Sequence, residues 1–247
     1  RAGPAPALVP VQVGMGAAYL ALLAVLPRRM TAPAWAGAIA LAVLMRLPWL
    51  FVPALPGGDY HRYLWDGAVV AHGMDPYARA PQAVAAGRAD EPALRQLAHT
   101  GRNTLQAVSH PQFRTIYPPA AQGAFAVAHA IAPFQLNAWR AVLLVFDVLA
   151  ALAVLGLARR AAMPLSLLLL YLWNPLLIIE TYADGHVDLL AGAGVVGFVW
   201  ALLAGRAAMA AVALALAVGV KLWPLVLLPF MLRALWGRWR LLALATA

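Results

Sequence analysis

The 247-residue sequence is 64% hydrophobic and only 11% charged, with a mean hydropathy of +0.78. Soluble domains carry about 25% charged residues, so this composition excludes a soluble globular domain and indicates an integral membrane protein. The net charge of +9 comes from arginines placed between apolar runs, a distribution typical of topology signals and lipid contacts, which argues against nucleic acid as a partner. The chain has no cysteine, and this excludes disulfide and thiolate sites.

Long Leu, Ala and Val runs without period-two alternation predict an all-α fold, a polytopic bundle of transmembrane helices. Two runs are shorter than the about 20 residues that a bilayer requires, namely 117–133 and 164–179, and we expect both to be steeply packed or partly re-entrant. The last run, interrupted at Lys221 and Pro224, predicts one kinked helix or two short ones. In chain order the candidate spans are 8–26, 34–55, 117–133, 139–158, 164–179, 187–204 and 207–235.

Arginine positions predict the topology of this single transmembrane domain, residues 1–247. Arg28-Arg29 places the first connection in the cytoplasm, and the loop 56–116 therefore on the opposite side. Arg159-Arg160 and Arg206 also favour the cytoplasm, which strict alternation of the spans does not allow. Either the third or the fourth segment fails to cross, or Arg159-Arg160 is external. Because the chain starts at Arg1 and stops inside an apolar run, we expect it to be part of a longer protein, incomplete at its C-terminus.

Two interfacial helices are expected in the loop 56–116, over 59–73 after Gly57-Gly58 and over 90–107. On the first, Asp59, Arg62 and Asp66 stand at i, i+3 and i+7 and share one face, while Trp65 belongs to an opposite, aromatic face suited to the membrane interface. A simple helix cap at Asp59 and an ordinary Arg62–Asp66 ion pair would explain the same residues without a function.

Charges elsewhere in the apolar sequence mark further candidate sites. Arg46 lies in the second run, and an intramembrane charge marks a site or a buried partner unless it snorkels to the surface. Acidic residues and a histidine gather between the fifth and sixth runs, in "NPLLIIETYADGHVDLL", where a solvated turn is the alternative. These residues are Glu180, Asp184, His186 and Asp188.

Two other charged residues lie in apolar surroundings. Lys221 is the only lysine and could hold an anionic headgroup or phosphate, or snorkel beside Trp223. Asp147, two turns after Arg140 in the fourth run, reads as a structural buried group. The sequence contains no H-E-x-x-H, no G-x-S-x-G and no P-loop, so we expect no cofactor and no metal site, with a divalent ion as an open alternative.

Four blocks of the sequence resemble a known family: "GGDYHRYLWDGAVVAHGMDPYARAP", "TIYPPAAQGAF", "NPLLIIETYADGHVDLL" and "VKLWPLVLLP". Together they are similar to the GT-C superfamily of membrane glycosyltransferases, and most similar to the bacterial polyprenyl-phosphate-mannose-dependent mannosyltransferases. The resemblance runs from about Arg46 to about Arg240. Its most specific element is Asp-Tyr-x-Arg-Tyr-x-Trp-Asp-Gly, which begins at Asp59.

The resemblance implies an inverting transfer of a hexose, with mannose expected, from a polyprenyl-phosphate donor to a glycan or glycolipid acceptor. The reaction would take place on the non-cytoplasmic side of the bacterial inner membrane. Asp59 matches the family's catalytic base, and Lys221, His186 and Arg62 match cations that hold the donor phosphate. The expected substrate-binding residues are Arg62, Tyr63, Asp66, Glu180, His186 and Lys221.

Elementary chemistry agrees with these roles. A carboxylate helps a sugar hydroxyl to attack by accepting its proton, and cations stabilise the charge that develops on a departing lipid phosphate. Two other readings stay open at this point. A transporter or lipid flippase predicts paired broken helices in related halves, of which only the break near Lys221 is evident. A non-catalytic membrane assembly subunit would use the loop carboxylates only as caps and ion pairs.

Overall fold

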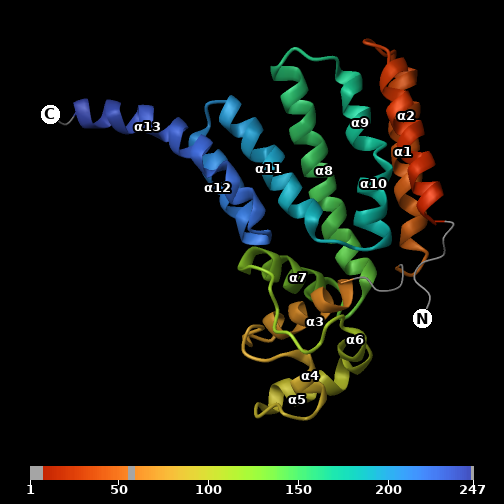
Figure 1. The fold of residues 1–247 in the computed structure, drawn as a ribbon, viewed down its shortest axis with the longest axis vertical. Helices are drawn as coiled ribbons and strands as arrows, with labels where there is room; N and C mark the ends of the chain where they lie inside the picture. The colour runs from red at the N-terminus through yellow and green to blue at the C-terminus, as the bar shows by residue number, and fades with distance from the viewer. Residues whose placement is uncertain (1–7, 55–58, 246–247) are drawn as a thin grey trace.

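The computed structural model describes residues 8–54 and 59–245, and these residues form helices and connecting loops without any strand. The all-α prediction is therefore confirmed. Figure 1 shows a bundle of long helices with a lobe of shorter helices at one end. The bundle contains α1 (Leu8–Val25), α2 (Ala32–Arg46), α8 (Leu136–Arg160), α9 (Leu168–Leu172), α10 (Pro175–Ile178), α11 (Asp188–Leu203), α12 (Ala207–Val220) and α13 (Leu228–Ala245). The lobe contains α3 (Tyr60–Ala71), α4 (Pro81–Ala85), α5 (Pro92–Thr100), α6 (Arg102–Ala107) and α7 (Pro119–Ile131).

Apolar length divides the bundle helices into two groups. In the described part of the chain, Ala32–Leu50 and Leu136–Arg160 are long and apolar enough to cross a membrane, and Leu165–Leu172 with Pro175–Ala183 could form a third span with a 44° bend. Four further helices are apolar but shorter: Val9–Leu22, Asp188–Leu203, Ala207–Val220 and Trp223–Trp236. The predicted end of the second span at residue 55 and the glycine break at 57–58 lie outside the described residues.

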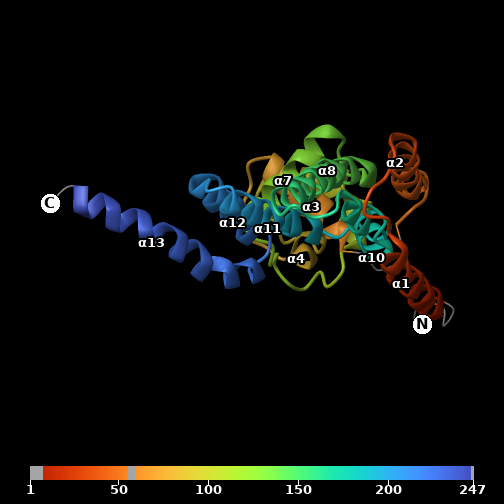
Figure 2. The ribbon, with the colours of Figure 1, turned by 90° about the horizontal axis from the view of Figure 1, so that it is seen from above.

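Proline and asparagine chemistry explains the two breaks in the bundle. Pro175 begins α10, and the side chain of Asn174 caps it by accepting a hydrogen bond from Leu177 N at 3.1 Å. The last predicted run forms two helices, since Lys221 is extended and a short 3-10 turn, Trp223–Leu227, with Pro224 as its second residue, comes before α13. In Figure 2 α13 points away from the rest of the bundle.

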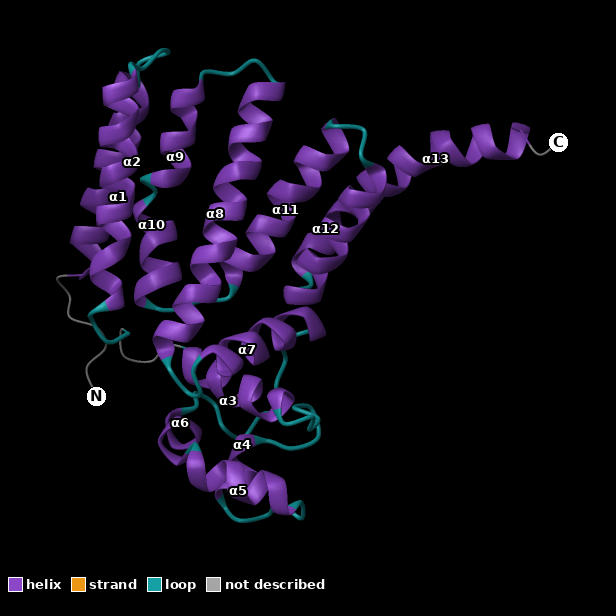
Figure 3. Cartoon of the chain, turned by 180° about the vertical axis from the view of Figure 1, so that it is seen from behind, coloured by secondary structure: helices purple, strands orange, loops and turns teal. Residues whose placement is uncertain are grey.

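The third predicted span, 117–133, does not cross the bundle. It forms α7, 13 residues long, which packs against α3 inside the lobe (Figure 3). A Cβ at Gly67 of α3 would lie 2.3 Å from the backbone oxygen of Phe125, so glycine is required for this close crossing. Of the topologies left open by the sequence, this is the one in which the third segment fails to cross.

With α7 in the lobe, the arginine-bearing connections of the bundle fall at one end. The loops between α1 and α2, between α8 and α9, and between α11 and α12 all lie at the end opposite the lobe (Figure 1). Arg28-Arg29 and Arg206 lie in the first and third of these loops, and Arg159-Arg160 are the last two residues of α8, directly before the second. The arrangement therefore agrees with the positive-inside rule without any external Arg159-Arg160.

Two details of the predicted loop helices are wrong. The expected helix over 90–107 is interrupted at Gly101, giving α5 and α6. Glycine is required at this break, since a Cβ there would lie 2.5 Å from the ring of Phe134. The side chain of Trp65 does not face the membrane interface: it is 3% exposed and packs with Leu94 and Leu97 in the core of the lobe. Helix α3 is thus an interior helix of the lobe.

The intramembrane charge of Arg46 has a buried partner and does not snorkel. Its Nε donates to Oδ2 of Asp147 at 2.6 Å, with side-chain exposures of 11% and 4%. Asp147 also accepts hydrogen bonds from the hydroxyls of Tyr171 and Tyr182, each at 2.7 Å. Arg140, on the same helix, instead donates to the carbonyl oxygens of Tyr182 and Val52. Asp147 is therefore the polar link between α2, α8 and the broken segment that contains α9 and α10.

Candidate functional site

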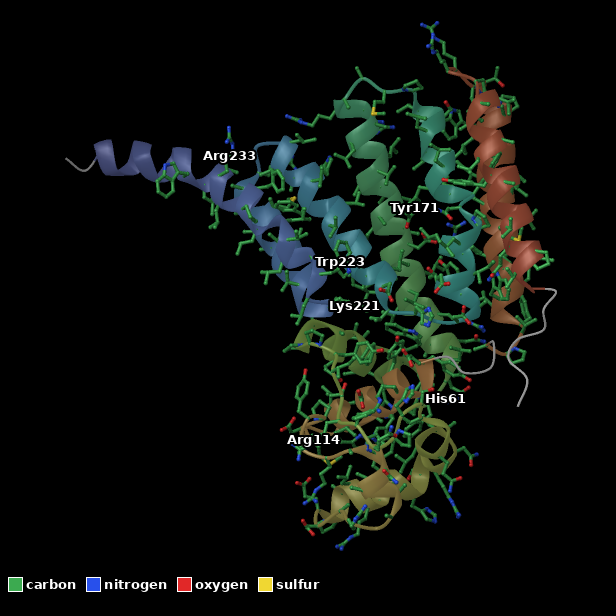
Figure 4. All side chains as sticks on the ribbon, in the orientation of Figure 1. His61, Arg114, Tyr171, Lys221, Trp223 and Arg233 are labelled. Carbon is green, nitrogen blue, oxygen red and sulfur yellow. The ribbon has the colours of Figure 1, made fainter. Side chains whose placement is uncertain are left out.

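A pocket of about 310 Å³ opens where the start of α3 meets the loop before α7. It combines one carboxylate with two arginines and a histidine, a set suited to a polar, anionic ligand. Figure 4 labels one of these arginines, Arg114, on the surface of the lobe. The pocket is lined by Asp59, Arg62, Ser109, His110, Phe113, Arg114, Ile116 and Tyr117.

Asp59 precedes the first residue of α3, but its side chain does not cap the helix. Its Oδ2 instead accepts a hydrogen bond from the hydroxyl of Tyr117 at 3.2 Å, so a plain capping role does not describe this carboxylate. Tyr117 also lies 3.3 Å, oxygen to oxygen, from the hydroxyl of the buried Tyr63. Tyr63, a predicted site residue, thus supports Tyr117 and does not line the pocket.

Burial raises the pKa of Tyr117 to about 12, and the nearby charges of Asp59 and Asp188 contribute to that rise. Burial likewise raises the pKa of Tyr63 above its ordinary value. Both phenols are therefore neutral at physiological pH and available as hydrogen-bond donors. By donating to the Asp59 carboxylate, the Tyr117 hydroxyl holds the orientation of that side chain.

Arg62 is 6% exposed and lines the pocket, where it stabilises the loop that forms another part of the lining. Its Nη2 donates to the carbonyl oxygens of Ser109 at 3.3 Å and His110 at 3.0 Å. Its Nη1 is buried and has no hydrogen-bond partner among the described residues. A buried nitrogen of a guanidinium group without a partner is costly, and it leaves Arg62, which lines the pocket, with a donor that is not used within the described part of the protein.

Asp66 shares a helix face with Asp59 and Arg62, as predicted, but it lies behind the pocket wall and does not line it. Its side chain is 2% exposed and forms no ion pair with Arg62 among the described residues. Gln122 Nε2 approaches its Oδ2 at 3.5 Å, and Thr115 also donates to it. Burial raises the pKa of Asp66 to about 6, against the lowering effects of Thr115, Arg62 and Gln122.

This pKa predicts a stability that falls as pH rises. The unfolded carboxyl has a pKa of 3.8 and the folded one of about 6, so the folded state binds the proton more tightly, and its free energy of unfolding decreases between these values by about 3 kcal/mol. We expect Asp66→Asn to remove this decrease, because an asparagine side chain does not titrate in this range. The new amide can also donate to the unpaired Oε1 of Gln122, which keeps the buried site paired. Thermal unfolding in detergent from about pH 4 to about pH 7 tests this.

The control for that experiment is Asp90→Asn, because Asp90 is an exposed carboxylate of the same lobe. It should show the same pH dependence as the wild type. Parallel curves for the wild type and Asp66→Asn would contradict the assignment.

The predicted residues Glu180 and His186 pair with each other beside the start of α3. Oε2 of Glu180 lies 2.7 Å from Nδ1 of His186, and Glu180 belongs to a π-helical turn, Ile179–Ala183. Gly185, with φ of +72°, lets this loop approach α3: a Cβ there would lie 3.3 Å from Cβ of Tyr60. Glu180, Asp184 and His186 offer ligand atoms within 4.8 Å of one another, a grouping that the sequence analysis did not read as a metal site.

Lys221 lies at the lower end of α12, where the bundle meets the lobe (Figure 4). Its Nζ donates to both carboxylate oxygens of Asp188, at 2.6 and 2.7 Å, so Lys221 is not a free cation here. Gly219 brings α12 to the lobe, because a Cβ at this position would lie 2.9 Å from Cβ of Ala120 at the start of α7. Asp188 in turn acts electrostatically on Tyr117.

The structure thus places Asp59, Arg62 and the Lys221–Asp188 pair around Tyr117, whereas Asp66 lies behind the pocket wall and Glu180 pairs with His186. Asp59 and Arg62 line the pocket on one side, and the Lys221–Asp188 pair lies on the other. Sequence reasoning missed three contributors, His110, Arg114 and Tyr117, and it named Asp188 as a candidate without identifying Lys221 as its partner. Tyr117 could have been found from its place before two prolines in "TIYPP", whereas His110 and Arg114 carried no distinguishing local signal.

An apolar groove of about 210 Å³ lies directly above this junction, between α8, α11 and α12. Its lower end includes Ala120 and Val220, next to Lys221, and its walls include Phe146, Leu190 and Leu216. Leu149 and Leu216 are accessible from the side of the bundle. The groove therefore joins the apolar surface of the bundle to the charged residues at its lower end.

Comparison with known proteins identifies the family. The family model described as alpha-(1→6)-mannopyranosyltransferase, N-terminal domain, matches residues 1–237. No curated protein and no solved structure matches the chain. The family assignment favours an enzyme over a transporter or an assembly subunit, and it agrees with the resemblance to GT-C mannosyltransferases. The chain, whose apolar helices indicate a membrane protein, belongs to the alpha-(1→6)-mannopyranosyltransferase family and is a glycosyltransferase that transfers mannose.

Proposed function

We propose that this GT-C-type enzyme transfers mannose, with inversion at the anomeric carbon, from a polyprenyl-phosphate donor to a hydroxyl of a glycan or glycolipid acceptor. The single observation that carries the proposal is the placement of Asp59 in a pocket beside Arg62, with Tyr117 holding its carboxylate. Asp59 accepts the proton of the acceptor hydroxyl as that oxygen attacks C1 of the mannose. The C1–phosphate bond breaks on the opposite side, and the lipid phosphate leaves as a phosphomonoester.

Cations around the pocket support the departure of the phosphate. Arg62 has an unpaired Nη1, and Arg114 lines the same pocket from an exposed position. The side chain of Lys221 is 33% exposed, and Asp188 neutralises its charge. Lys221 therefore contacts a phosphate only if Asp188 moves away or if the phosphate binds beside the Lys221–Asp188 pair. Guanidinium groups aimed at phosphate oxygens stabilise the charge that grows on them.

The apolar groove between α8, α11 and α12 suits the polyprenyl tail. It is apolar, opens on the side of the bundle and ends beside Lys221. A lipid chain lying there would place its phosphate at the junction between bundle and lobe. This geometry supports a lipid-linked donor over a water-soluble nucleotide sugar.

Charge asymmetry supports an outward-facing site. The arginine-bearing loops of the bundle lie opposite the lobe (Figure 1), and such loops face the cytoplasm. The lobe with Asp59 would then lie on the non-cytoplasmic side of the bacterial inner membrane. A cytoplasmic nucleotide sugar would not reach it, in agreement with the lipid-linked donor.

The donor is tested by offering the intact, detergent-purified protein either mannosyl polyprenyl phosphate or GDP-mannose with a mannose oligosaccharide as acceptor. We expect transfer from the lipid-linked donor alone. Inversion requires that a β-linked donor give an α-linked product, which NMR of the product reports. Transfer from GDP-mannose at a comparable rate, or retention of the donor configuration, would refute the proposal.

A further inference from the structure

A second pocket of about 280 Å³ lies at the other end of α3 and plays no part in the site described above. It is lined by residues of α5, by the C-terminal end of α7 and by His72, which follows the last residue of α3. At about 1.5 Å per helical residue, His72 lies about 20 Å along α3 from Asp59. The two pockets share no lining residue.

His129 forms the floor of this pocket with an unused polar atom. It is 7% exposed, and its Nδ1 is buried without a hydrogen-bond partner among the described residues. Burial and the neighbouring His72 lower its pKa, so the ring is neutral at physiological pH. A buried polar atom left unpaired costs free energy. Because Nδ1 is covered in this structure, a ligand in the pocket would pair with it once the ring turns toward the pocket.

The rim supplies further hydrogen-bonding groups from exposed side chains. Nδ1 of His72 donates to the carbonyl oxygen of Ala68 at 2.8 Å, so in the neutral ring Nε2 is an acceptor. Gln96 and Thr100, on consecutive turns of α5, add an amide and a hydroxyl. The Thr100 hydroxyl donates to the carbonyl oxygen of Gln96 at 3.1 Å, so it is left as an acceptor, while the Gln96 amide both donates and accepts. The rim therefore offers both donors and acceptors.

One wall of the pocket is apolar and includes an aromatic ring held in an unusual conformation. Phe134 has φ of +59°, which is rare for a bulky residue. Its ring packs over Gly101 and meets His129 edge to face, with centroids 4.9 Å apart. Leu97 and Pro133 complete this wall.

The chemistry of the lining selects among ligand classes. No Lys, Arg, Asp or Glu of the described residues lines the pocket, which disfavours a phosphate or another charged ligand. Its volume is far larger than a metal ion needs, and a purely apolar ligand would leave His129 and the rim unpaired. A neutral sugar ring satisfies both features, since its C–H face packs on an aromatic or apolar wall and its hydroxyls both donate and accept.

We propose that this pocket, formed by His72, Gln96, Thr100, His129 and Phe134, is an accessory subsite for a neutral saccharide unit of the acceptor glycan. The proposal rests on the proposed function, which supplies a glycan as acceptor. A subsite this far from Asp59 contacts an oligosaccharide and lies beyond the reach of a single acceptor sugar. It therefore favours longer acceptors over short ones.

The test uses Ala93→Trp in the intact protein. Ala93 is exposed and lines the pocket, so an indole there fills the space without removing a buried contact. Ala107→Trp is the matched control, an exposed helical alanine of the lobe outside the described pockets. For an α-1,6-linked mannose oligosaccharide as acceptor we expect Ala93→Trp to raise KM about tenfold, while KM for a mannose monosaccharide acceptor and the Ala107→Trp kinetics stay unchanged.

A readout independent of activity is photo-crosslinking of the same oligosaccharide carrying a diazirine, followed by peptide mapping. Labelling of peptides containing α5 and Phe134 should be lost in Ala93→Trp and reduced in Gln96→Ala, which alters only an exposed side chain. Unchanged labelling in both variants, or equal changes of KM for long and short acceptors, would overturn the subsite. Absence of transfer by the wild type would instead refute the proposed function, since the crosslinking result does not depend on it.

Discussion

Asp59→Asn is expected to lower kcat for mannosyl transfer by about 10²- to 10⁴-fold, the usual contribution of a general base. Asparagine has nearly the same shape, and its amide oxygen can still accept the hydrogen bond that Tyr117 donates to Oδ2 of Asp59. What it loses is the ability to take the proton of the attacking hydroxyl. The variant should therefore fold as the wild type does, which thermal unfolding checks, while the lipid-donor transfer assay reports the lost rate.

Asp75→Asn is the control for this result. Asp75 is an exposed carboxylate of the same lobe, and its Oδ1 accepts a hydrogen bond from the backbone N of Tyr77. The amide oxygen of asparagine can accept the same bond. The change of net charge is the same, but Asp75 does not line the pocket of Asp59. If Asp59→Asn retained more than about a tenth of wild-type kcat, or if Asp75→Asn lost as much, the role assigned to Asp59 would be wrong.

The sequence located α3 and its polar face because both are local properties. The glycines, the helical spacing of Asp59, Arg62 and Asp66, and the Gly73 turn all lie within one short stretch. How deeply each residue of that face is buried, however, depends on helices that are distant in the sequence. Helix α7 covers the part of α3 that contains Asp66, so spacing alone could not show that Asp59 reaches a pocket and Asp66 does not.

Contacts between residues far apart in the sequence were also not predictable from local patterns. Lys221 was read as a free cation because Asp188, its partner, is 33 residues away. The close contact between Gly101, at the break of the second loop helix, and the ring of Phe134 involves a residue from another segment altogether. The apolar segment 117–133 suited a membrane span or a buried lobe helix equally by composition, and only its packing against α3 decided between them.

Asp147→Ala is expected to produce the largest loss of stability in the bundle. The substitution leaves the guanidinium of Arg46 buried without its counter-charge and removes the acceptor of the Tyr171 and Tyr182 hydroxyls. Removal of one partner of a buried pair costs 3–5 kcal/mol. We expect about 3 kcal/mol, at the lower end of that range, because Nη1 of Arg46 keeps its bonds to the carbonyl oxygens of Ala42 and Leu172. Unfolding in detergent, followed by circular dichroism, measures the loss.

The double variant Arg46→Leu with Asp147→Leu separates the cost of an orphaned charge from the value of the pair itself. With both charges gone, no uncompensated ion stays buried, and apolar replacements of a buried pair are often neutral or stabilising. We therefore expect the double variant to be more stable than Asp147→Ala, although it lacks more polar contacts. The two leucines would lie in apolar surroundings, since the other residues that line the pocket beside Arg46 and Asp147, such as Ile39, Val43 and Leu144, are apolar. A double variant that is less stable than Asp147→Ala would show that the ion pair itself holds α2 to α8.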